Sequence, residues 1–401
     1  MSVLRGKKVL LGITGGIAAY KAPLIARLLI REGAQVQVVM TPSAKEFVTP
    51  LTLSTLTDRP VLSSFTDEED ENAVWNNHVA LGIWADFMLI APATANTLSK
   101  MASATSDNLL LATYLSAKCP VYFAPAMDLD MYKHPATLKT IQQLESFGNV
   151  NIPAASGFLA SGLHGEGRMQ EPEYIVQFLK EDISNHLPLR SKKFLISAGP
   201  TYESIDPVRF IGNHASGKMG FTLANQAAMM GAEVILVTGP THEKTEYPNI
   251  EVVPVISAKE MYTSCMERFN DVEVAIMSAA VSDYKPTDVA AQKIKKKTGN
   301  LTIQLSPTTD ILAQMGVDKT HQFLVGFALE TENELEHAFQ KLKKKNLDAI
   351  VLNSLNDQGA GFGTPTNKIT FIDATLKTKE FELKPKNEVA LDIITEIIAR
   401  L

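Results

Sequence analysis

The sequence predicts an α/β protein with two doubly wound, Rossmann-like domains, each built in three layers with helices on both faces of a parallel sheet. Residues 8–16 and 193–199 both begin with an apolar run and lead into a glycine-containing loop. A helical stretch follows each loop, after which Gly231-Ala-Glu-Val-Ile-Leu-Val echoes Gly33-Ala-Gln-Val-Gln-Val-Val. A strand, a loop, a helix and a second strand in this order form the repeating unit of a parallel sheet.

Length and composition agree with this organisation. The chain has 401 residues, of which 45% are hydrophobic and 20% are charged, and its formal net charge is −6. At roughly 150 residues per domain, this length favours two or three domains. The acidic balance argues against a generally basic nucleic-acid-binding protein. Local clusters of lysine nevertheless suit small anionic ligands.

Cysteine usage and hydropathy narrow the cellular setting. Cys119 and Cys265 are too few for a disulfide framework or a cysteine-rich zinc site, which favours a reducing, cytoplasmic location. No apolar run reaches the ~18 residues of a membrane span. The N-terminal residues superficially resemble a signal peptide, but Gly12, Gly15 and Gly16 interrupt the run. We therefore expect a strand and a loop there.

The first half of the chain alternates strands with helices. Its opening strand starts at Lys8, and the helix that follows, Ile17 to Glu32, carries Tyr20, Leu24 and Leu28 on one face. Short apolar runs between helical stretches are typical of central parallel strands. Such runs predict further strands at Val36–Val39, Phe87–Ala91 and Val121–Ala124.

The second half follows the same pattern. Its opening strand starts at Lys193, and its first helix runs from Ser216 to Met230. Polar residues with Pro188 and Arg190 break the periodicity between the halves, so we predict domains over 1–185 and 192–401, joined by a linker over 186–191. Further elements are predicted as strands at Val274–Ser278, Phe323–Ala328 and Ala349–Asn353, an edge strand at Lys368–Asp373, and a last helix at Glu388–Arg400.

Loops after the first-half strands suit a polar or anionic ligand. Thr14-Gly-Gly-Ile-Ala presents backbone N–H groups before a helix, although a purely structural turn fits these residues equally well. No acidic residue ends the second strand, so the ribose carboxylate of an NAD site is missing. Ala91-Pro-Ala-Thr-Ala-Asn96 follows another strand, and the glycine-dense residues 157–169 indicate a mobile flap. His78 starts a helix, where a lone histidine is more often structural than functional.

Taken together, these motifs resemble the FMN-dependent cysteine decarboxylase family. The matching segments cover most of residues 1–180 in order and are Gly15-Gly-Ile-Ala-Ala-Tyr-Lys21, Asn77-His-Val, Ala91-Pro-Ala-Thr-Ala-Asn, Pro125-Ala-Met and Leu159-Ala-x-Gly-x-x-Gly-x-Gly-Arg-Met. The second half resembles phosphopantothenate–cysteine ligase over nearly its full length. The whole chain is therefore similar to the bifunctional family of coenzyme A biosynthesis, with a flavoprotein-type domain followed by a ligase-type domain.

By this resemblance, the first domain binds FMN and decarboxylates 4′-phospho-N-pantothenoylcysteine to 4′-phosphopantetheine. The flavin of this family oxidises the thiol end of the substrate, which lets CO₂ leave, and then returns the electrons. His78 is the implied acid–base residue. The residues matched to FMN are Gly15, Gly16, Ile17, Thr41, Ser43, Pro92, Thr94 and Asn96. The residues matched to the substrate are Met127, Ala160, Gly162, Arg168 and Met169.

Two candidate catalytic positions depart from the family pattern. Asp128 replaces an asparagine whose amide meets the substrate carboxylate, and an ionised aspartate repels that group unless it turns away. Ser161 replaces a cysteine whose thiol is a candidate proton donor to the enethiolate, and serine is a far weaker acid. The rest of the motif set still favours an active decarboxylase.

The loop after the first strand of the second half is unusually long. It runs from Ser197 to Gly220, includes Arg209, and matches part of a phosphate-binding loop over Gly212 to Lys218. Met219 stands where that pattern requires serine or threonine, which disfavours a true phosphate-binding loop. The basic groups at 293–297 and 341–345 fit either a solvated surface or polyphosphate binding.

The ligase resemblance favours polyphosphate binding. It implies that the phosphopantothenate carboxylate attacks the α-phosphate of CTP and that cysteine then displaces CMP from the acyl-cytidylate. Lysines, with Mg²⁺ or Mn²⁺ held through the triphosphate, would neutralise the developing charge. Asn213 matches the residue that contacts the acyl-cytidylate, and Arg209 lies in the same motif. The positions matched to CTP are Ala279, Asp283, Lys293, Thr309, Asp310, Ile311, Phe327, Lys341 and Lys345, although Ser306-Pro-Thr-Thr-Asp310 departs from the usual family sequence.

Other functions compete with this two-step enzyme. A ligase-only enzyme with a degenerate flavin domain accounts for Asp128 and Ser161. A flavin-binding regulatory subunit fits the first domain but not the matches in the second, and an NAD-dependent dehydrogenase fits neither glycine loop. The resemblance also implies a homo-oligomer, trimeric through the flavin domain and dimeric through the ligase domain, which makes a dodecamer overall. We expect no nucleic-acid or membrane partner.

Overall fold

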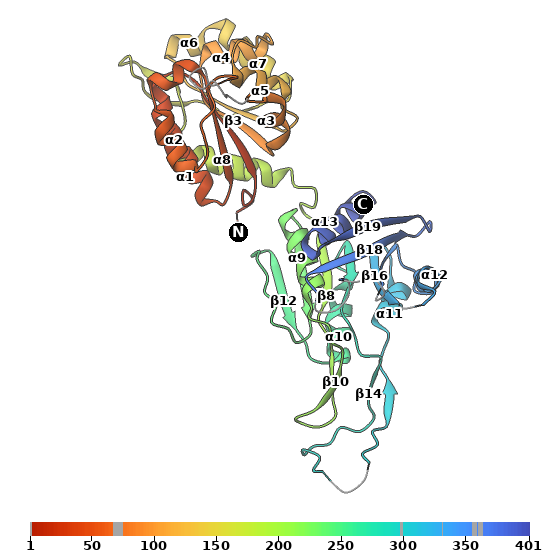
Figure 1. Cartoon of the computed structure of the whole chain (residues 1–401). Helices are drawn as coiled ribbons and strands as arrows, with labels where there is room; N and C mark the ends of the chain where they lie inside the picture. The colour runs from red at the N-terminus through yellow and green to blue at the C-terminus, as the bar shows by residue number, and fades with distance from the viewer. Residues whose placement is uncertain (1, 67–74, 297–299, 331, 355–358, 360–363) are drawn as a thin grey trace. The chain divides into compact units, whose positions relative to one another are not determined.

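A computed structural model describes residues 2–66, 75–296, 300–330, 332–354, 359 and 364–401 (Figure 1). Within these residues the chain forms two compact units, Ser2–Ser184 and Asn185–Leu401. Lys297, the last lysine of the first basic group, lies outside the described residues. No helix among those described is long and apolar enough to cross a membrane.

The first unit is built on a five-stranded sheet, as far as its described residues go, and all neighbouring strands are parallel. In spatial order the strands are β2 (Gln35–Met40), β1 (Lys8–Ile13), β3 (Phe87–Ala93), β4 (Val121–Pro125) and β5 (Val150–Asn151). The chain order reverses between β1 and β3. In open parallel sheets a crevice forms at such a switch point, outside the carboxyl ends of the strands.

Helices cover both faces of this sheet, which confirms the predicted three-layer fold. Val9 and Leu11 of β1 pack with buried residues of α1 and α8, whereas Leu10 packs with those of α4, α5 and α7. The alternation follows from the two-residue period of a strand. The helical segments are η1 (Ile17–Lys21, 3₁₀), α1 (Ala22–Arg31), η2 (Pro42–Glu46, 3₁₀), α2 (Pro50–Thr57), α3 (His78–Trp84), α4 (Ala95–Ala102), α5 (Leu109–Ser116), α6 (Leu129–Lys133), α7 (Pro135–Ser146) and α8 (Pro172–Asn185).

The second unit has an eight-stranded sheet within the described part of the chain. Its strands in spatial order are β12 (Ile250–Pro254), β11 (Glu233–Thr238), β8 (Lys193–Ala198), β13 (Val274–Met277), β16 (Phe323–Glu330), β17 (Ala349–Ser354), β18 (Thr366–Asp373) and β19 (Thr378–Pro385). The strands from β12 to β17 are parallel, and β18 and β19 continue the sheet in antiparallel pairing. The switch point lies between β8 and β13.

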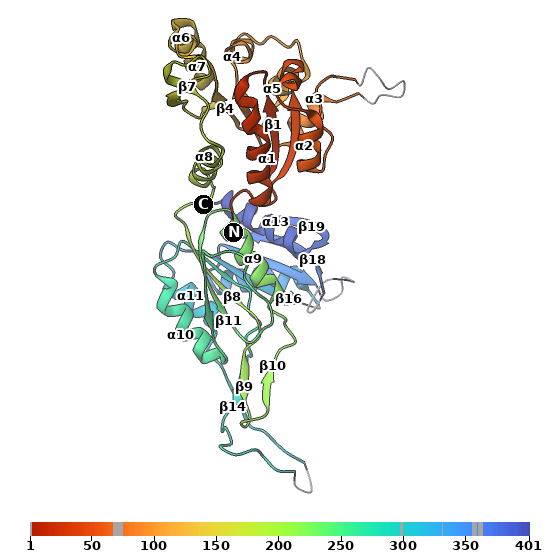
Figure 2. The same ribbon diagram turned by 90° about the vertical axis from the view of Figure 1, so that its left-hand side faces the viewer.

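Helices also cover both faces of the second sheet (Figure 2). Phe194 and Ile196 of β8 pack with α9 and α13, whereas Leu195 packs with α10, α11 and α12. The helices are α9 (Lys218–Met229), α10 (Ala258–Phe269), α11 (Ile311–Asp318), α12 (Glu334–Lys344) and α13 (Lys386–Ile398). This arrangement confirms the doubly wound fold predicted for the second half.

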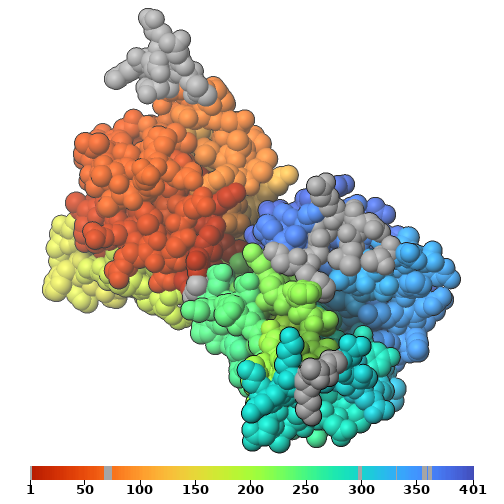
Figure 3. Space-filling model, turned by 60° about the horizontal axis from the view of Figure 1, so that its bottom comes forward, coloured from red at the N-terminus to blue at the C-terminus, as the bar shows by residue number. Residues whose placement is uncertain are grey.

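Short antiparallel hairpins extend from both sheets, and the sequence pattern did not predict them. In the first unit β6 (Ala155–Phe158) pairs with β7 (His164–Arg168). In the second, β9 (Tyr202–Ser204) pairs with β10 (Phe210–Gly212), and β14 (Tyr284–Pro286) pairs with β15 (Leu305–Pro307). The β9–β10 and β14–β15 hairpins lie side by side, and Figure 3 shows their green and cyan surfaces adjoining.

Two elements of the structure differ in detail from the sequence prediction. The helix expected from Ile17 begins as a 3₁₀ turn, and its α-helical part starts at Ala22 with Pro23 in the first turn, where the missing N–H of proline has no helical acceptor to lose. The strand near Lys368 is not an edge strand, because β19 pairs along its outer side. In β19, charged residues surround the apolar residues Phe381 and Leu383. The strand therefore lacks the apolar run that identified the central strands.

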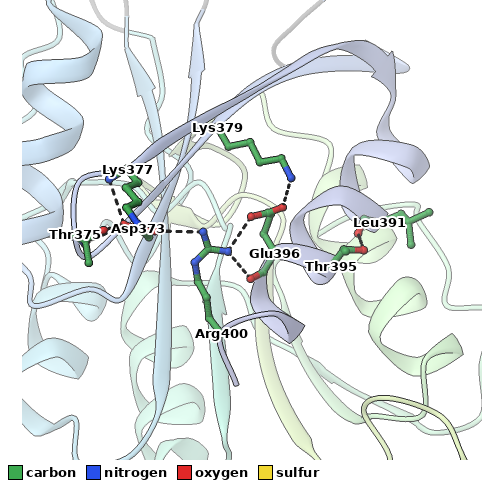
Figure 4. Close-up of polar contacts among 8 residues, drawn as sticks. All are labelled: Asp373, Thr375, Lys377, Lys379, Leu391, Thr395, Glu396 and Arg400. Atoms are coloured by element: carbon green, nitrogen blue, oxygen red, sulfur yellow. Dashed lines mark hydrogen bonds and ion pairs between the residues drawn. The ribbon is translucent and has the colours of Figure 1, made fainter.

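The C-terminal elements are joined by a charged cluster (Figure 4). The guanidinium of Arg400 at the end of α13 contacts Glu396 at 2.8 Å and Asp373 of β18 at 3.2 Å. Lys379 of β19 reaches the same Glu396 carboxylate. Since Glu396 is only 9% exposed, these contacts hold its charge in a largely buried place between the last helix and the last two strands.

Candidate active sites in the two units

The first unit contains a cavity of about 920 Å³ at the carboxyl ends of β1 and β3. This position is the switch point of the sheet, where the fold predicts a ligand. Its lining contains hydroxyl, amide and backbone donors together with apolar side chains. The predicted residues that line it are Gly15, Gly16, Ile17, Thr41, Ser43, Thr94, Asn96, Met127, Asp128, Ala160, Arg168 and Met169.

Thr14 fixes the two loops that meet at the switch point. Its hydroxyl donates to the carbonyl of Pro92 at 2.7 Å and accepts from the amide of Thr94 at 3.1 Å. Thr14 is fully buried, so both bonds are shielded from water. The predicted residue Pro92 therefore contributes to the site through its backbone, since it does not itself line the cavity.

The glycine turn after β1 is packed closely against the loop after β2. A Cβ atom on Gly15 would lie 2.4 Å from the Oγ of Ser43 and 2.9 Å from its backbone carbon. The hydroxyls of Thr41 and Ser43 lie 3.3 Å apart and face the same cavity. Gly15 is therefore needed for this close approach, which places hydroxyl and amide donors together at one end of the cavity.

The β6–β7 hairpin forms another wall and is attached at its base. The amide of Met127 donates to the carbonyl of Gly167 at 2.9 Å, and a Cβ on Gly167 would lie 2.5 Å from the carbonyl oxygen of Met127. Lys21, which is only 3% exposed, donates to the carbonyl of Met169 at 2.9 Å and to Glu171 at 3.1 Å. The glycine-turn segment and the hairpin are thus joined directly.

Asp128 differs from the other charged residues of the cavity. Lys100 is paired with Asp107, while Lys21 and Arg168 are both paired with Glu171. In the described part of the chain Asp128 has no cationic partner, and its Oδ1 accepts from the amide of Leu129 at 2.6 Å as the cap of α6. The cavity wall therefore carries a carboxylate whose charge no neighbouring cation compensates.

Other predicted residues of the first unit do not line the cavity. His78 starts α3 as predicted, but it does not line the cavity, and its buried Nδ1 has no hydrogen-bond partner among the described residues. Ser161 is exposed at the tip of the hairpin, where its Oγ accepts from the amide of Leu163 at 3.4 Å. Gly162 beside it has a φ of 88°, a left-handed conformation that favours glycine.

Sequence reasoning missed several cavity residues. Tyr20, Lys100, Asp107, Asn108 and Met131 line the cavity as well. Asn108 caps α5 by accepting from the amide of Leu111 at 3.1 Å. An asparagine directly before an apolar helical run is a recognisable signal for a helix start, and it would have located this loop at the carboxyl side of the sheet.

In the second unit, polar contacts connect the ends of β8 and β13. The side-chain amide of Asn213 donates to the carbonyl of Ala280 at 2.9 Å, next to the predicted residue Ala279. The amide of Ala279 donates to the hydroxyl of Ser197 at 3.1 Å, and the amide of Ala280 to the carbonyl of Gly199 at 2.9 Å. Asn213 therefore lies beside Ala280, next to the predicted residue Ala279, at the switch point between β8 and β13.

A compact charged group follows at the ends of β16 and α12. Lys341 donates to the carbonyl of Phe327 at 2.8 Å, and Lys345 donates to Asp310 at 3.0 Å. Burial, together with the nearby Lys345, lowers the pKa of Lys341, while Glu330, Asp310 and Asp283 oppose this shift. Burial alone would raise the pKa of Asp310, but the hydrogen bond from Lys345 holds it below its usual value. Five predicted CTP residues are thus close enough to interact.

The remaining ligase positions differ in how accessible their side chains are. Ile311 is 4% exposed and packs in the hydrophobic core, so only its backbone can face a ligand. Lys293 is exposed, whereas Arg209 contacts the buried carboxylate of Asp206 at 2.7 Å. Thr309 directly precedes Asp310, the cap of α11. No group of three or more His, Cys, Asp or Glu among the described residues is arranged to hold a metal ion.

Comparison with known proteins identifies both units. A flavoprotein family model matches residues 2–184, and the model described as the C-terminal domain of DNA/pantothenate metabolism flavoprotein matches residues 189–401. The coenzyme A biosynthesis bifunctional protein of Bacillus subtilis (strain 168) is 40% identical over 399 residues, which are 99% of this chain and 98% of that protein. The chain belongs to this bifunctional family. The resemblance seen in the sequence is thereby confirmed.

Other relatives include two kinds of protein. The coenzyme A biosynthesis bifunctional protein of Vibrio parahaemolyticus is 46% identical over 92% of both chains. A cysteine/cysteine sulfinic acid decarboxylase from an unknown prokaryotic organism is 53% identical over 357 residues, which are 88% of this chain and 99% of that protein. A crystal structure of the C-terminal domain of a bifunctional relative covers 53% of this chain and 97% of its own, with 39% identity and a TM-score of 0.46.

Proposed function

We propose that the chain catalyses two consecutive steps of coenzyme A biosynthesis. The second unit joins 4′-phosphopantothenate to L-cysteine at the expense of CTP, and the first unit decarboxylates the resulting 4′-phospho-N-pantothenoylcysteine. The observation that carries this proposal is that the chain matches the bifunctional relatives over nearly the full length of both and has a cavity at the switch point of its first unit. FMN, CTP and a divalent cation are the cofactors and co-substrate that these steps require.

The cavity of the first unit fits FMN in size and in chemistry. Its volume of about 920 Å³ is typical of a small-molecule pocket. We infer that Thr41, Ser43 and the Gly16 backbone bind the phosphate and that Thr94 and Asn96 bind the polar edge of the cofactor. When bound, FMN supplies the reversible oxidation of the substrate thiol. We infer that Ala160, Arg168 and Met169, together with Met127, hold the substrate and exclude water, while Gly162 supplies the left-handed turn at the tip of the hairpin.

In the second unit the charged group at β16 and α12 suits a nucleoside triphosphate. Lys341 and Lys345 offer cationic donors, Phe327 offers a ring, and Asp283 and Asp310 offer acceptors. We infer that Mg²⁺ binds chiefly through the triphosphate, as is usual for this ion. Asn213 and Arg209 orient the acyl-cytidylate, and Lys293 neutralises charge on the α-phosphate as pyrophosphate leaves.

The competing ligase-only function is less well supported. A flavin unit that served only as scaffold would have no need for an open cavity of about 920 Å³ at its switch point. A purified protein that releases FMN on denaturation, and that releases CO₂ from phosphopantothenoylcysteine, supports both steps. Pyrophosphate release without CO₂ release supports the ligase-only function. Release of FAD or NAD in stoichiometric amount contradicts the flavin assignment.

Asp128 favours free cysteine as a second candidate substrate of the first unit. An N-acylated cysteine with a phosphate brings only negative charge to the cavity, whereas free cysteine also brings an α-ammonium group. The uncompensated Asp128 carboxylate would attract that ammonium through a charge-assisted hydrogen bond. The 53% identical relative is named for decarboxylation of cysteine and cysteine sulfinic acid.

Asp128→Asn separates the two substrates. Asparagine keeps the oxygen that caps α6, so we expect the fold of the wall to persist. If the carboxylate selects an ammonium, the variant loses at least about 10-fold in CO₂ release from cysteine relative to phosphopantothenoylcysteine, since a hydrogen bond to a charged group is worth about 1.5–3 kcal/mol. An unchanged preference removes free cysteine as a candidate. Flavin absorbance during single turnover locates the affected step.

Assembly and location follow as further parts of the proposal. The exposed apolar side chains Val79 and Ile83 on α3 and Leu115 on α5 fit a subunit contact through the flavin unit. We infer a homo-oligomer, with trimers through this unit and dimers through the ligase unit, in the cytoplasm. Sedimentation of the full chain tests the assembly.

A further inference from the structure

The second unit contains a fully enclosed carboxylate at the turn between β9 and β10. The side chain of Asp206 has 0% exposure. Its Oδ1 accepts from the amides of Val208 and Arg209 at 2.8 and 2.9 Å, and its Oδ2 accepts from the amide of Ile294 at 3.1 Å. The guanidinium of Arg209 lies 2.7 Å from Oδ2. Among the described residues, each hydrogen-bond or ion-pair partner of this carboxylate is therefore a donor.

These bonds connect two segments that are far apart in the sequence. Arg209 donates from Nη2 to the carbonyl of Ile294 at 2.5 Å, so both backbone groups of Ile294 are held by the β9–β10 turn. The amide of Ala290 also donates to the carbonyl of Ile205 at 3.0 Å. Residues 288–296 form no helix or strand, so their position depends on such contacts. Lys293 directly precedes the residue that is held.

The charge state of Asp206 is fixed by the same contacts. Burial alone would raise its pKa, but the three backbone amides and Arg209 lower the pKa to about 2. The carboxylate therefore stays ionised over the working range of an enzyme. Its partners leave no acceptor for an amide NH₂, so asparagine cannot replace it without placing donor against donor.

We propose that Asp206 is a positioning residue of the ligase, which holds the segment of Lys293 and the guanidinium of Arg209 in fixed relation at the nucleotide site. This inference rests on the proposed ligase function. Asp206 itself is enclosed by protein groups and acts through its two neighbours. Misplacement of a catalytic group by about 1 Å can cost ~10²-fold in rate, which sets the scale of the expected effect.

The test measures CTP-dependent pyrophosphate release by the full chain carrying Asp206→Asn. We expect a loss of ~10²-fold that falls mainly on kcat, because Lys293 acts as the α-phosphate is attacked. Trypsin should also cut faster within residues 293–296, and the donor-against-donor contact should lower the thermal midpoint of the ligase unit while leaving the protein folded at the assay temperature. Asp288→Asn, an exposed acid in the same segment, is the matched control and should retain wild-type values in both assays.

A double-mutant cycle distinguishes positioning from general weakening. If Asp206 acts through the Lys293 segment, Asp206→Asn costs little more once Lys293→Ala is present, since the two changes remove one coupled function. Losses that multiply, or a single variant with unchanged kcat and unchanged cleavage, overturn the inference. If Asp206→Asn does not fold, Ile294→Pro removes that amide donor from the other side of the contact, and its ring also restricts the backbone of Lys293, so it must reproduce the kcat loss. A wild-type protein without CTP-dependent pyrophosphate release contradicts the ligase function instead, while trypsin cleavage still reports on the contact.

Discussion

The two units share the switch point of a parallel sheet, yet the groups that gather on the carboxyl side of each sheet differ in kind. In the flavin unit, the loops after β1 and β3 bring glycine, threonine and serine close together, and a hairpin closes over them into a cavity of about 920 Å³. In the ligase unit, the corresponding edge carries lysines paired with carboxylates, such as Lys345 with Asp310. The strand order determines where a ligand binds, whereas the loops determine whether it is enclosed or held by charge.

The largest expected effect is a loss of ligase activity with no change in decarboxylase activity. Lys293→Ala should reduce CTP-dependent pyrophosphate release by ~10²–10³-fold, as removal of one preorganised catalytic donor usually does. CO₂ release from supplied phosphopantothenoylcysteine should not change, because the flavin unit has its own site. Lys296→Ala in the same exposed segment is the control. Near-normal pyrophosphate release by the Lys293 variant would show that this basic group is solvated surface and does not bind CTP.

The next effect tests the closed packing of the flavin unit. In Gly15→Ala the new Cβ would lie 2.4 Å from the Oγ of Ser43, so the glycine turn or the loop after β2 must shift. Overpacking of this kind costs about 1–3 kcal/mol, and we expect lower flavin content and a lower thermal midpoint of this unit. Gly157→Ala is the control, because its Cβ would meet Arg168 only at 3.4 Å. Full flavin content in Gly15→Ala would argue against a tight cofactor cradle.

A smaller change concerns proton delivery at the hairpin. Ser161→Cys should speed the re-oxidation of reduced flavin, because a thiol is a far stronger acid than a hydroxyl. Ser161 is exposed and does not line the cavity, so we expect about 10-fold at most, below the ~10²–10⁴-fold of a well-placed general acid. Stopped-flow flavin absorbance measures this rate, with Ser156→Cys on β6 as control. Equal rates would exclude position 161 as the donor.

The smallest effect is a pH dependence confined to the ligase unit. Burial alone would raise the pKa of Glu396, but hydrogen bonds from Lys379 and Arg400 hold it below its usual value. A carboxyl group whose pKa is lower in the folded state stabilises the fold above its unfolded pKa of about 4.3, and this contribution is lost as the pH falls through the folded pKa. Glu396→Gln should therefore lower the thermal midpoint at neutral pH and flatten its decline in acid. We expect about 1 kcal/mol or less, and equal acid slopes would show that the cluster adds nothing.

The central sheets could be predicted from the sequence because their strands are short apolar runs between helices. The runs at Phe87 and Val274, for example, became β3 and β13. The hairpins could not be predicted, since strands of three residues such as β9 and β14 show no periodicity. Contacts between residues that are far apart in the sequence could not be predicted either. Asp206 and Ile294 are 88 residues apart, and only the folded chain brings the carboxylate to that amide.

The residue types at the sites were more predictable than their distances. The family resemblance implied that Gly15, Thr94 and Asp128 belong to one site, and the structure puts all three around one cavity. The resemblance did not reveal that His78 does not line that cavity or that Ile311 turns its side chain into the core. Both residues occupy the expected loop or helix start, and the orientation of a side chain there depends on tertiary packing that a motif does not encode.

The outermost strand of the second sheet has a consequence for colloidal behaviour. A sheet that ended at β18 would expose a strand with unpaired backbone groups, which is a template for the strand of another molecule. β19 covers β18 and presents Lys379, Glu380, Glu382 and Lys384 along its length. Charged side chains on a terminal strand discourage further strand addition. β19 therefore protects the sheet against fibrous self-association at high protein concentration.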